Sequence, residues 1–291
     1  MLPSFLSEHY PFTPRTFTLP CGNEMSYVDV GEGPAVVMLH GNPTWSFYYR
    51  NLGALLKNHY RIIIPDHIGC GLSSKPQKYQ YTLTTHINNL QLLLKHLNLD
   101  SISLVLHDWG GAIGMGLASR NPQSIQTITV LNTAAYRSHR IPFRIRICRI
   151  PVFGTIMIQG FNAFARAALI MAVSRKMASE INQCYLFPYD SWKNRIATLR
   201  FVQDIPLSPK DPSYNTLIHI ENTLEEFQDT PMVICWGGKD FCFNDQFFDE
   251  WQKRFPQAEC HYFPEAGHYV LEDAFELIGP IIKEFLSVNI T

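Results

Sequence analysis

The sequence predicts an α/β fold with a mostly parallel sheet that is interrupted once by a helical insertion. Short β-rich runs alternate with helical patterns, which is typical of parallel βαβ units. Four runs, at 35–39, 61–64, 102–106 and 232–236, are almost wholly apolar, as expected for strands that are buried on both faces. The alternation stops between about 134 and 214, where the sequence has no strand-like run.

The first two expected strands form an antiparallel hairpin that leads into the sheet. They lie at 17–20 and 25–30, and the turn Cys21-Gly22-Asn23 separates them. The other expected strands lie at 35–39, 61–64, 102–106, 127–131, 232–236 and 259–263. Helical patterns follow strands and their loops at 82–98, 111–120, 245–254 and 273–287.

The insertion divides the chain into two expected domains. Residues 1–133 and 215–291 form the core, and residues 134–214 form a helical cap. Ligands of open α/β sheets bind outside the carboxyl ends of the strands, so we expect the cap to cover that edge.

The composition is typical of a globular protein with a substantial core. Of the 291 residues, 46% are hydrophobic and 17% are charged, and the net charge of −1 gives no indication of nucleic-acid binding. Neither GxGxxG nor GxxxxGK[ST] is present, so the sequence has no nucleotide-binding signature. Seven scattered cysteines without a CxxC motif, and an N-terminus without a signal-peptide pattern, predict a cytoplasmic protein.

One stretch of the insertion is apolar enough to raise the question of a membrane span. Residues 151–173 read PVFGTIMIQGFNAFARAALIMAV, but Gln159 and Arg166 interrupt them, and an arginine inside a span is costly. Helices that cover an apolar pocket are therefore favoured. From 109 to 179 the chain has nine basic residues and no Asp or Glu, which would also suit an anionic membrane surface or an acidic partner protein.

Polar motifs follow several of the expected strands at their carboxyl ends. HGNPTWS (40–46), HDWGG (107–111) and WGGKD (236–240) each follow an apolar run, and EAGHYVLED follows the last one. In parallel strands these loops open on one edge of the sheet. The order of nucleophile, acid and histidine along the chain is that of α/β-hydrolases.

Asp108 is the candidate nucleophile. Gly110 and Gly111 provide the small residues that a tight strand–turn–helix elbow needs, although Leu106 replaces the glycine found two residues earlier in many elbows. The alternative interpretation is that Asp108 only caps the following helix. A carboxylate is ionised at neutral pH and forms an ester when it attacks an alkyl carbon, so its presence predicts chemistry at alkyl carbon or at a strained ring.

His268 is the candidate base, and Asp240 is the acid that orients it. Asn132 occupies the alternative position for an orienting acid but is neutral, and Asp245 is the nearest other carboxylate. The remaining histidines of interest are interpreted as structural; they are His40, His67, His107 and His261.

Two donors are candidates for binding an anionic leaving group. Trp109 offers an indole N–H and Asn42 an amide N–H₂, and both can stabilise negative charge above an apolar cavity. Their backbone N–H groups are candidates for an oxyanion hole. The alternative for Trp109 is packing in the core.

Four stretches together resemble the haloalkane dehalogenase family of α/β-hydrolases: HGNPTWSFYYRNL, PDHIGCGLSSKP, LHDWGGAIG and GHYVLED. The resemblance implies an α/β-hydrolase fold with an eight-stranded sheet, an inserted helical cap and no cofactor. It also implies a triad of Asp108, His268 and Asp240, with Trp109 and Asn42 as leaving-group donors.

Motifs mostly within the insertion at 134–214 resemble one group of proteins within this family. FNAFARAA, VSRKM, YDSWKNRIATLRFVQDIPLSP and DFCFND are similar to the β-lactone decarboxylases of the bacterial head-to-head olefin pathway. This similarity implies decarboxylation of long-chain cis-β-lactones to cis-alkenes, with partner enzymes in a multi-enzyme assembly. The sequence leaves the oligomeric state open.

Three other functions stay open at this point. The first is hydrolytic dehalogenation, with Asp108 displacing halide and His268 activating water. The second is epoxide hydrolysis, which would need two cap tyrosines as proton donors, and the candidates are Tyr136, Tyr185, Tyr189 and Tyr214. The third is a non-catalytic binding protein that reuses the pocket.

Overall fold

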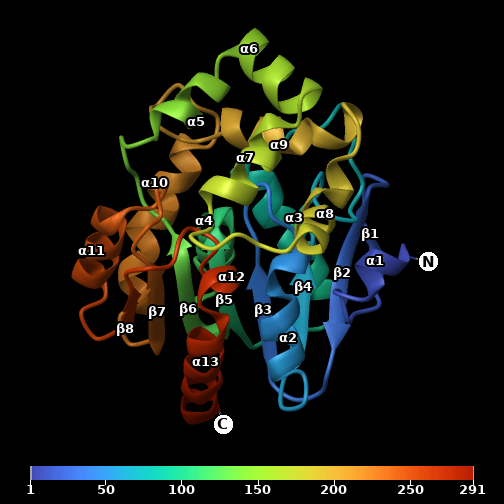
Figure 1. Ribbon diagram of the computed structural model, residues 1–291. Coiled ribbons are helices and arrows are strands. Elements are labelled where there is room, and N and C mark those ends of the chain that lie inside the picture. Colours follow the sequence, from blue (N-terminus) through green and yellow to red (C-terminus); the bar gives the residue numbers. More distant parts are fainter. Residues whose placement is uncertain (1, 291) are drawn as a thin grey trace.

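The computed structural model describes residues 2–290 and has one eight-stranded sheet at its centre (Figure 1). The strand order is β1-β2-β4-β3-β5-β6-β7-β8. β1 pairs antiparallel with β2 and β2 pairs antiparallel with β4, whereas all later pairs are parallel. The strands are β1 (Arg15–Thr18), β2 (Glu24–Val30), β3 (Ala35–Leu39), β4 (Arg61–Pro65), β5 (Ile102–Asp108), β6 (Ile125–Thr133), β7 (Met232–Gly237) and β8 (Glu259–Phe263). The predicted α/β-hydrolase topology is confirmed.

The first strand differs from its prediction by two residues. It ends at Thr18, and Leu19 is a buried residue of the turn, whose N–H donates to the carbonyl oxygen of Asn23. A buried apolar residue in the turn extends the apolar pattern of the strand in the sequence, which explains the shift of the predicted bounds.

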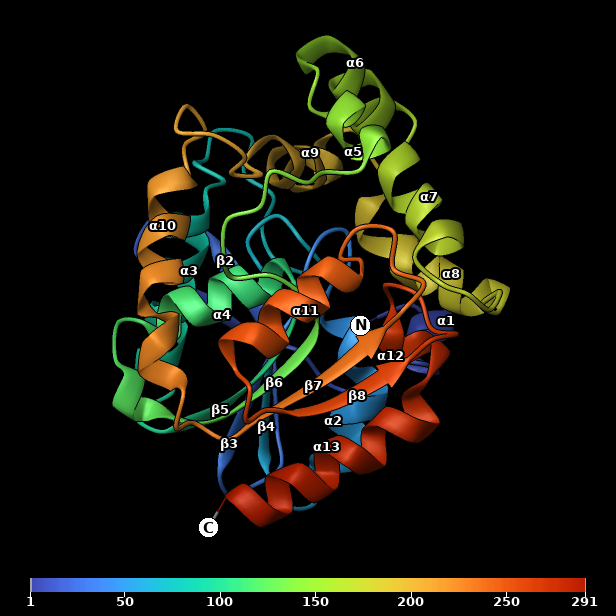
Figure 2. The ribbon, with the colours of Figure 1, turned by 90° about the vertical axis from the view of Figure 1, so that its left-hand side faces the viewer.

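Two layers of helices cover the sheet (Figure 2). One face is packed by α3 (Leu83–His96), α4 (Trp109–Ala118), α10 (Tyr214–Thr223) and α11 (Asp245–Arg254). The other face is packed by α2 (Arg50–Leu56) and α13 (Phe275–Asn289), with the short α1 (Ser4–Ser7) and α12 (Val270–Asp273) nearby. Strands β3 and β5 are buried along their whole length, so this double cover explains their apolar composition.

Several helices of the core differ from the sequence prediction, and α1, α10 and α12 were not predicted. The helix expected at 111–120 begins at Trp109, so Asp108 ends a strand and no loop separates it from α4. Helix α2 has seven residues and was not predicted, because a run this short and rich in leucine carries little helical periodicity.

Residues 134–214, which we call the cap segment, form helices and connecting turns above the carboxyl ends of the strands (Figure 1). The structure has no strand within this described segment. Its helices are α5 (Phe143–Cys148), α6 (Pro151–Thr155), the π-helical turn η3 (Ile156–Gly160), α7 (Ala163–Met171), α8 (Ser179–Leu186) and α9 (Ile196–Gln203).

The apolar stretch of the cap segment is broken into short helices. No single helix among residues 2–290 has both the length and the apolar composition to cross a bilayer. Pro151–Gly160 and Ala163–Met171 reach that length and composition only as a pair, and the pair is bent by 73° at its break.

Candidate active site

Asp108 lies at a sharp bend where β5 passes directly into α4. Its φ of 51° is in the left-handed region, which a non-glycine residue adopts only under strain. A Cβ atom at Gly110 would overlap the carbonyl oxygen of Leu39, and one at Gly111 would overlap the Thr133 side chain. The bend therefore requires both glycines, as the sequence analysis expected.

A third glycine is essential to this geometry, and the sequence analysis did not identify it. A Cβ atom at Gly41 would overlap the side chain of Asp108. The HGNP motif contained a signal for it, because a glycine shortly after a buried strand often marks a place where another group approaches the backbone closely.

The helix-capping interpretation of Asp108 is also realised in the structure. Asp108 occupies the N-cap position of α4, and one carboxylate oxygen accepts a hydrogen bond from the N–H of Trp109. The other oxygen is directed to His268. One side chain thus caps the helix and faces the cavity, so the two interpretations do not exclude each other.

His268 lies within hydrogen-bond distance of both carboxylates of the expected triad. Nε2 of His268 is 3.0 Å from Oδ2 of Asp108, and Nδ1 of His268 is 2.7 Å from Oδ2 of Asp240. Asp108 ends β5, Asp240 follows β7 and His268 follows β8, so the parallel sheet brings residues from distant positions to one edge. All three side chains are largely buried.

Asp240 is held by further hydrogen bonds that fix its orientation. Its Oδ1 accepts the N–H groups of Cys242, at 2.6 Å, and Phe243, at 3.1 Å. Its Oδ2 accepts the amide of Asn132 at 3.1 Å in addition to His268. Asn132 therefore supports the carboxylate and does not replace it.

The competing carboxylate is directed elsewhere. Asp245 accepts a hydrogen bond from the hydroxyl of Tyr262, 2.7 Å away, on the surface of the protein. This leaves Asp240 as the acid that contacts His268.

The two carboxylates determine the protonation of His268. Burial lowers the pKa of the imidazole, but Asp240 and Asp108 outweigh it and raise the pKa to about 10. His268 is therefore an imidazolium at neutral pH when both carboxylates are free. Esterification of Asp108 would remove one of the two negative charges that raise the pKa of His268.

His107 contacts the backbone of His268. Its Nε2 lies 2.9 Å from the carbonyl oxygen of His268, and its ring stacks on Tyr48. Burial lowers the pKa of His107 well below its usual value. A neutral Nε2–H that donates to this carbonyl fixes the backbone of His268, in agreement with the structural interpretation.

The other histidines have structural or surface contacts. Nε2 of His40 accepts the N–H of His67 at 3.1 Å, and Nε2 of His67 lies 3.0 Å from the carbonyl of His40. His261 contacts Glu259 at the surface, with 2.6 Å between Nε2 and Oε1.

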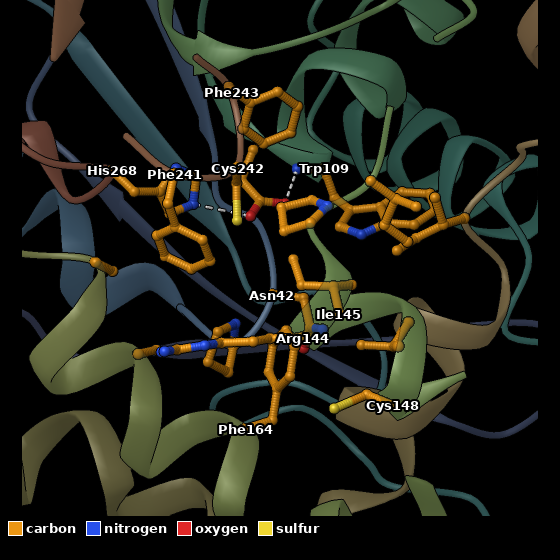
Figure 3. A pocket seen from close by; sticks show the side chains of 18 of the residues that line it. Asn42, Trp109, Arg144, Ile145, Cys148, Phe164, Phe241, Cys242, Phe243 and His268 are labelled. Atoms are coloured by element: carbon orange, nitrogen blue, oxygen red, sulfur yellow. Dashed lines mark hydrogen bonds and ion pairs between the residues drawn. The ribbon is translucent and has the colours of Figure 1, made fainter. Parts of the chain in front are cut away.

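Asn42 and Trp109 lie on the wall of the same cavity (Figure 3). Nδ2 of Asn42 donates to the carbonyl of Thr198 in α9 at 3.2 Å, so one amide hydrogen is committed and the second is free. The indole N–H of Trp109 has no acceptor among residues 2–290. The cavity thus has two available donors beside Asp108.

The cavity has a volume of about 430 Å³ and is mostly apolar. The core provides its floor, including Asp108, Trp109 and His268, and the cap segment provides its roof (Figure 3). Roof residues include Ile145, Cys148, Phe153, Met157, Phe164, Ala167, Met171 and Val202. Such a lining favours a ligand with apolar arms and little polarity outside its reacting centre.

The candidate cap tyrosines do not form a pair of donors over this cavity. Tyr136 lines it, but its hydroxyl donates to the carbonyl of Phe247 at 2.8 Å. Tyr185 donates to Glu272, and Tyr189 donates to the carbonyl of Thr44 at 3.4 Å. Neither of these, nor Tyr214, lines the cavity.

Comparisons with known proteins agree with this geometry. A family profile described as alpha/beta hydrolase fold matches residues 34–152. The protein named cis-3-alkyl-4-alkyloxetan-2-one decarboxylase from Shewanella oneidensis is 46% identical over 280 residues, which cover 94% of this chain and 88% of the relative. A protein of the same name from Xanthomonas campestris pv. campestris is 42% identical, with 96% and 98% covered.

A solved structure shows the same overall architecture. The crystal structure of haloalkane dehalogenase DbeA from Bradyrhizobium elkani USDA94 superimposes with a TM-score of 0.88. The two sequences are 26% identical, and the match covers 95% of this chain and 98% of DbeA.

Proposed function

Because this chain belongs to the α/β-hydrolase family that includes the cis-3-alkyl-4-alkyloxetan-2-one decarboxylases, we propose that it converts long-chain cis-β-lactones into cis-alkenes and CO₂. The observation that carries the proposal is the identity of 46% over 94% of the chain with a relative of that name. The apolar cavity above a buried carboxylate supports it, because a dialkyl β-lactone has one small polar ring and two apolar arms.

In the proposed reaction, Asp108 attacks the ring carbon that carries the lactone oxygen. The bond between this carbon and the ring oxygen breaks, which opens the strained ring and leaves a free carboxylate. The bond to that carboxylate then breaks, its electron pair forms the alkene, and Asp108 leaves the adjacent carbon. The products are alkene and CO₂, and Asp108 is regenerated without water.

This sequence of steps accounts for the geometry of the alkene. Attack by Asp108 from the side opposite the ring oxygen inverts the configuration of one carbon. An anti elimination then restores the relation between the two alkyl arms that the ring imposed. A cis-lactone consequently yields a cis-alkene.

His268 and Asp240 have an electrostatic role in this proposal. No proton needs to move in the overall reaction, so the imidazolium of His268 stays charged and stabilises the carboxylate released from the ring. Asp240 keeps the imidazolium in place through its 2.7 Å contact. Asn42 and Trp109 donate hydrogen bonds to the same developing anion.

Hydrolytic dehalogenation is the second candidate. It is favoured by the two free donors beside Asp108, which suit a departing halide, and by the similarity to DbeA. In that reaction the alkyl ester of Asp108 must be cleaved by water, and His268 must act as base.

A labelled-water experiment distinguishes the two reactions. The protein is incubated in H₂¹⁸O with a long-chain cis-β-lactone and, separately, with 1-bromohexane or 1,2-dibromoethane. The proposal predicts alkene, no halide release and no label in Asp108 by peptide mass spectrometry. Bromide release with label in Asp108 and no alkene from the lactone would instead establish the dehalogenase.

The variant His268→Gln also distinguishes decarboxylation from hydrolytic dehalogenation. Without its base, a dehalogenase stalls as a covalent alkyl ester of Asp108, detectable as an added mass. The decarboxylation needs no base, so this variant should still form alkene, at a rate reduced about 10²-fold through loss of the positive charge. An accumulated ester with lactone would contradict the proposed second step.

Epoxide hydrolysis and non-catalytic binding are less favoured functions. An epoxide hydrolase needs tyrosine donors at the cavity, and the hydroxyl of Tyr136 is already engaged with a carbonyl. A binding protein would retain saturable lactone affinity without either product. The strained carboxylate beside a histidine argues against the binding protein, whereas an epoxide hydrolase would use the same pair.

The remaining parts of the proposal concern domains and location. We propose that residues 1–133 and 215–291 act as the catalytic core and residues 134–214 as the cap that shapes the substrate pocket. We also propose a cytoplasmic protein, which is supported by seven cysteines that form no disulfide within residues 2–290. The sequence similarity further supports partner enzymes that supply the lactone.

A further inference from the structure

The cap segment has an exposed surface that the reaction itself does not require. We propose that this surface docks on an anionic lipid bilayer, so that the cavity opens toward the lipid phase. The inference concerns α5, α6, η3 and α7, of which α6 and α5 lie far from the sheet in Figures 1 and 2. It deepens the proposed function, on which it rests only for the identity of the substrate drawn from the lipid.

The first observation is a concentration of exposed apolar side chains. Among residues 2–290, thirteen large hydrophobic side chains are exposed, and eight of them belong to the cap segment. They are Phe143, Ile150, Val152, Phe153, Ile156, Phe161, Ile170 and Trp192, which we call the cap face. Phe143, Val152 and Ile170 are each more than 70% exposed. A cluster of this kind marks a surface that is covered in function.

The second observation is the charge around the cap face. The cap segment contains twelve Lys and Arg against four Asp and Glu, whereas the rest of the chain contains twelve against twenty-one. Arg140, Arg144, Arg146 and Arg166 are exposed and form no ion pair with a described carboxylate. Apolar side chains bordered by free cations match an anionic lipid surface, in which lipid tails meet negative headgroups.

The third observation is the position of the cavity. Phe153 of the cap face lines the cavity and is exposed, as are Arg140 and Arg144, so the cavity reaches the surface at the cap face. The exposed Phe241 of the core also lines the cavity. A lactone with two long alkyl arms dissolves in lipid and hardly in water. A mouth in contact with the bilayer would let substrate enter, and alkene leave, without crossing water.

The shape of the cap fits a surface position. The helical stretches Pro151–Gly160 and Ala163–Met171 are bent by 73° relative to each other, and α7 has only nine residues. Nine residues span about 14 Å, roughly half of the hydrocarbon core. Such helices lie in the interface, about 5–10 Å deep, with arginines at the headgroups.

The test is co-sedimentation of the full chain with vesicles. Vesicles of phosphatidylcholine alone are compared with vesicles that contain roughly one third phosphatidylglycerol. We expect binding to the anionic vesicles that weakens at high salt. Absence of binding at low salt would overturn the proposal, and equal binding to neutral vesicles would overturn its electrostatic basis.

Matched variants locate the binding surface. Val152→Glu and Ile170→Glu change exposed cap-face residues that do not line the cavity, and Val288→Glu on α13 is the control with the same 72% exposure as Val152. The cap variants should lose vesicle binding at least about tenfold, while the control retains it. Arg146→Glu should weaken binding about fivefold or more, and Lys253→Glu on α11 should not. Equal losses in cap and control variants would contradict the proposed surface.

A short-chain, water-soluble cis-β-lactone separates this proposal from the proposed function. In buffer without lipid, Val152→Glu should turn it over like the unmodified protein. In the presence of anionic vesicles loaded with a long-chain lactone, the variant should be slower. Vesicle binding without any lactone turnover would disprove the function and leave the docking surface intact. Unimpaired turnover of vesicle-loaded lactone would disprove delivery through the cap face.

Discussion

The core and the cap segment differ in which side chains they bury and which they expose. In the core, polar groups are buried and held by hydrogen bonds, as with Asp240, which accepts from His268, Asn132, Cys242 and Phe243. In the cap segment, apolar side chains such as Phe143 and Ile170 are exposed. The difference shows that packing in the core holds charged side chains in fixed positions. The cap segment encloses the cavity with apolar side chains and leaves other apolar side chains exposed.

If this division is correct, substitutions in the core affect the chemistry for every substrate. Substitutions in the part of the cavity wall that the cap segment provides should affect only substrates whose alkyl arms are long enough to contact it. Single substitutions in the two regions should therefore differ in size of effect and in substrate dependence.

Replacement of the nucleophile should have the largest effect. Asp108→Asn keeps the shape of the side chain but removes the charge that attacks carbon, so alkene formation should fall at least about 10³-fold for all substrates. Product is measured by gas chromatography. The control is Asp245→Asn, which changes a surface carboxylate bound to Tyr262 and should retain activity. Substantial turnover by Asp108→Asn would disprove the nucleophile.

The next effect concerns the acid that contacts His268. Asp240→Asn removes the charge at Nδ1 of His268 and should lower kcat by up to about 10²-fold, because Asp240 acts through His268. Asn132→Asp should cost much less, because Asn132 contacts Asp240 and not the histidine. The comparison is made on kcat with one lactone. A larger loss in Asn132→Asp would reverse the assignment of the acid.

A change in the roof should affect long substrates selectively. Ile145→Trp on α5 fills part of the cavity and should lower kcat/KM for long-arm lactones about tenfold, with little effect on short ones. Ile156→Trp is the control, because Ile156 is half exposed and does not line the cavity. Equal losses for short and long substrates would show that the roof acts on the chemistry itself.

The last prediction concerns stability at high pH and not activity. The pKa of His268 is raised to about 10, so its charge stabilises the fold fully below its unfolded value near 6.5 and loses this effect as pH rises through 10. The free energy of unfolding should therefore decrease between pH 7 and 10, by on the order of a few kcal/mol, relative to His268→Gln. Denaturant titrations at several pH values measure it, and parallel curves for both proteins would contradict the raised pKa.

Much of the fold could be predicted from the sequence because parallel strands and their helices have strong local patterns. The apolar runs at 35–39 and 102–106 coincide with β3 and with most of β5. The first strand and α2 were misjudged, since a buried turn residue and a seven-residue helix have no distinctive periodicity. The helical character of 134–214 followed from the absence of strand-like runs.

The candidate site was predicted less completely. Asp108, His268, Asp240, Asn42 and Trp109 follow apolar runs in motifs that can be recognised. The structure brings four of them to one cavity and places Asp240 against His268. Gly41 was not identified. His107 was interpreted as structural and Asn132 was considered as an alternative to the acid, but their contacts with His268 and Asp240 were not predicted, because each joins residues far apart in the sequence.

The sequence by itself determined the type of chemistry, since a carboxylate at the bend after a buried strand is suited to alkyl carbon whatever surrounds it. It also determined that a basic, apolar insertion follows β6. Only the tertiary structure decided which acid contacts His268, where the cavity opens and which apolar side chains of the cap stay exposed. These properties depend on distances between segments that are up to 160 positions apart, as Asp108 and His268 are, and no local pattern encodes such distances.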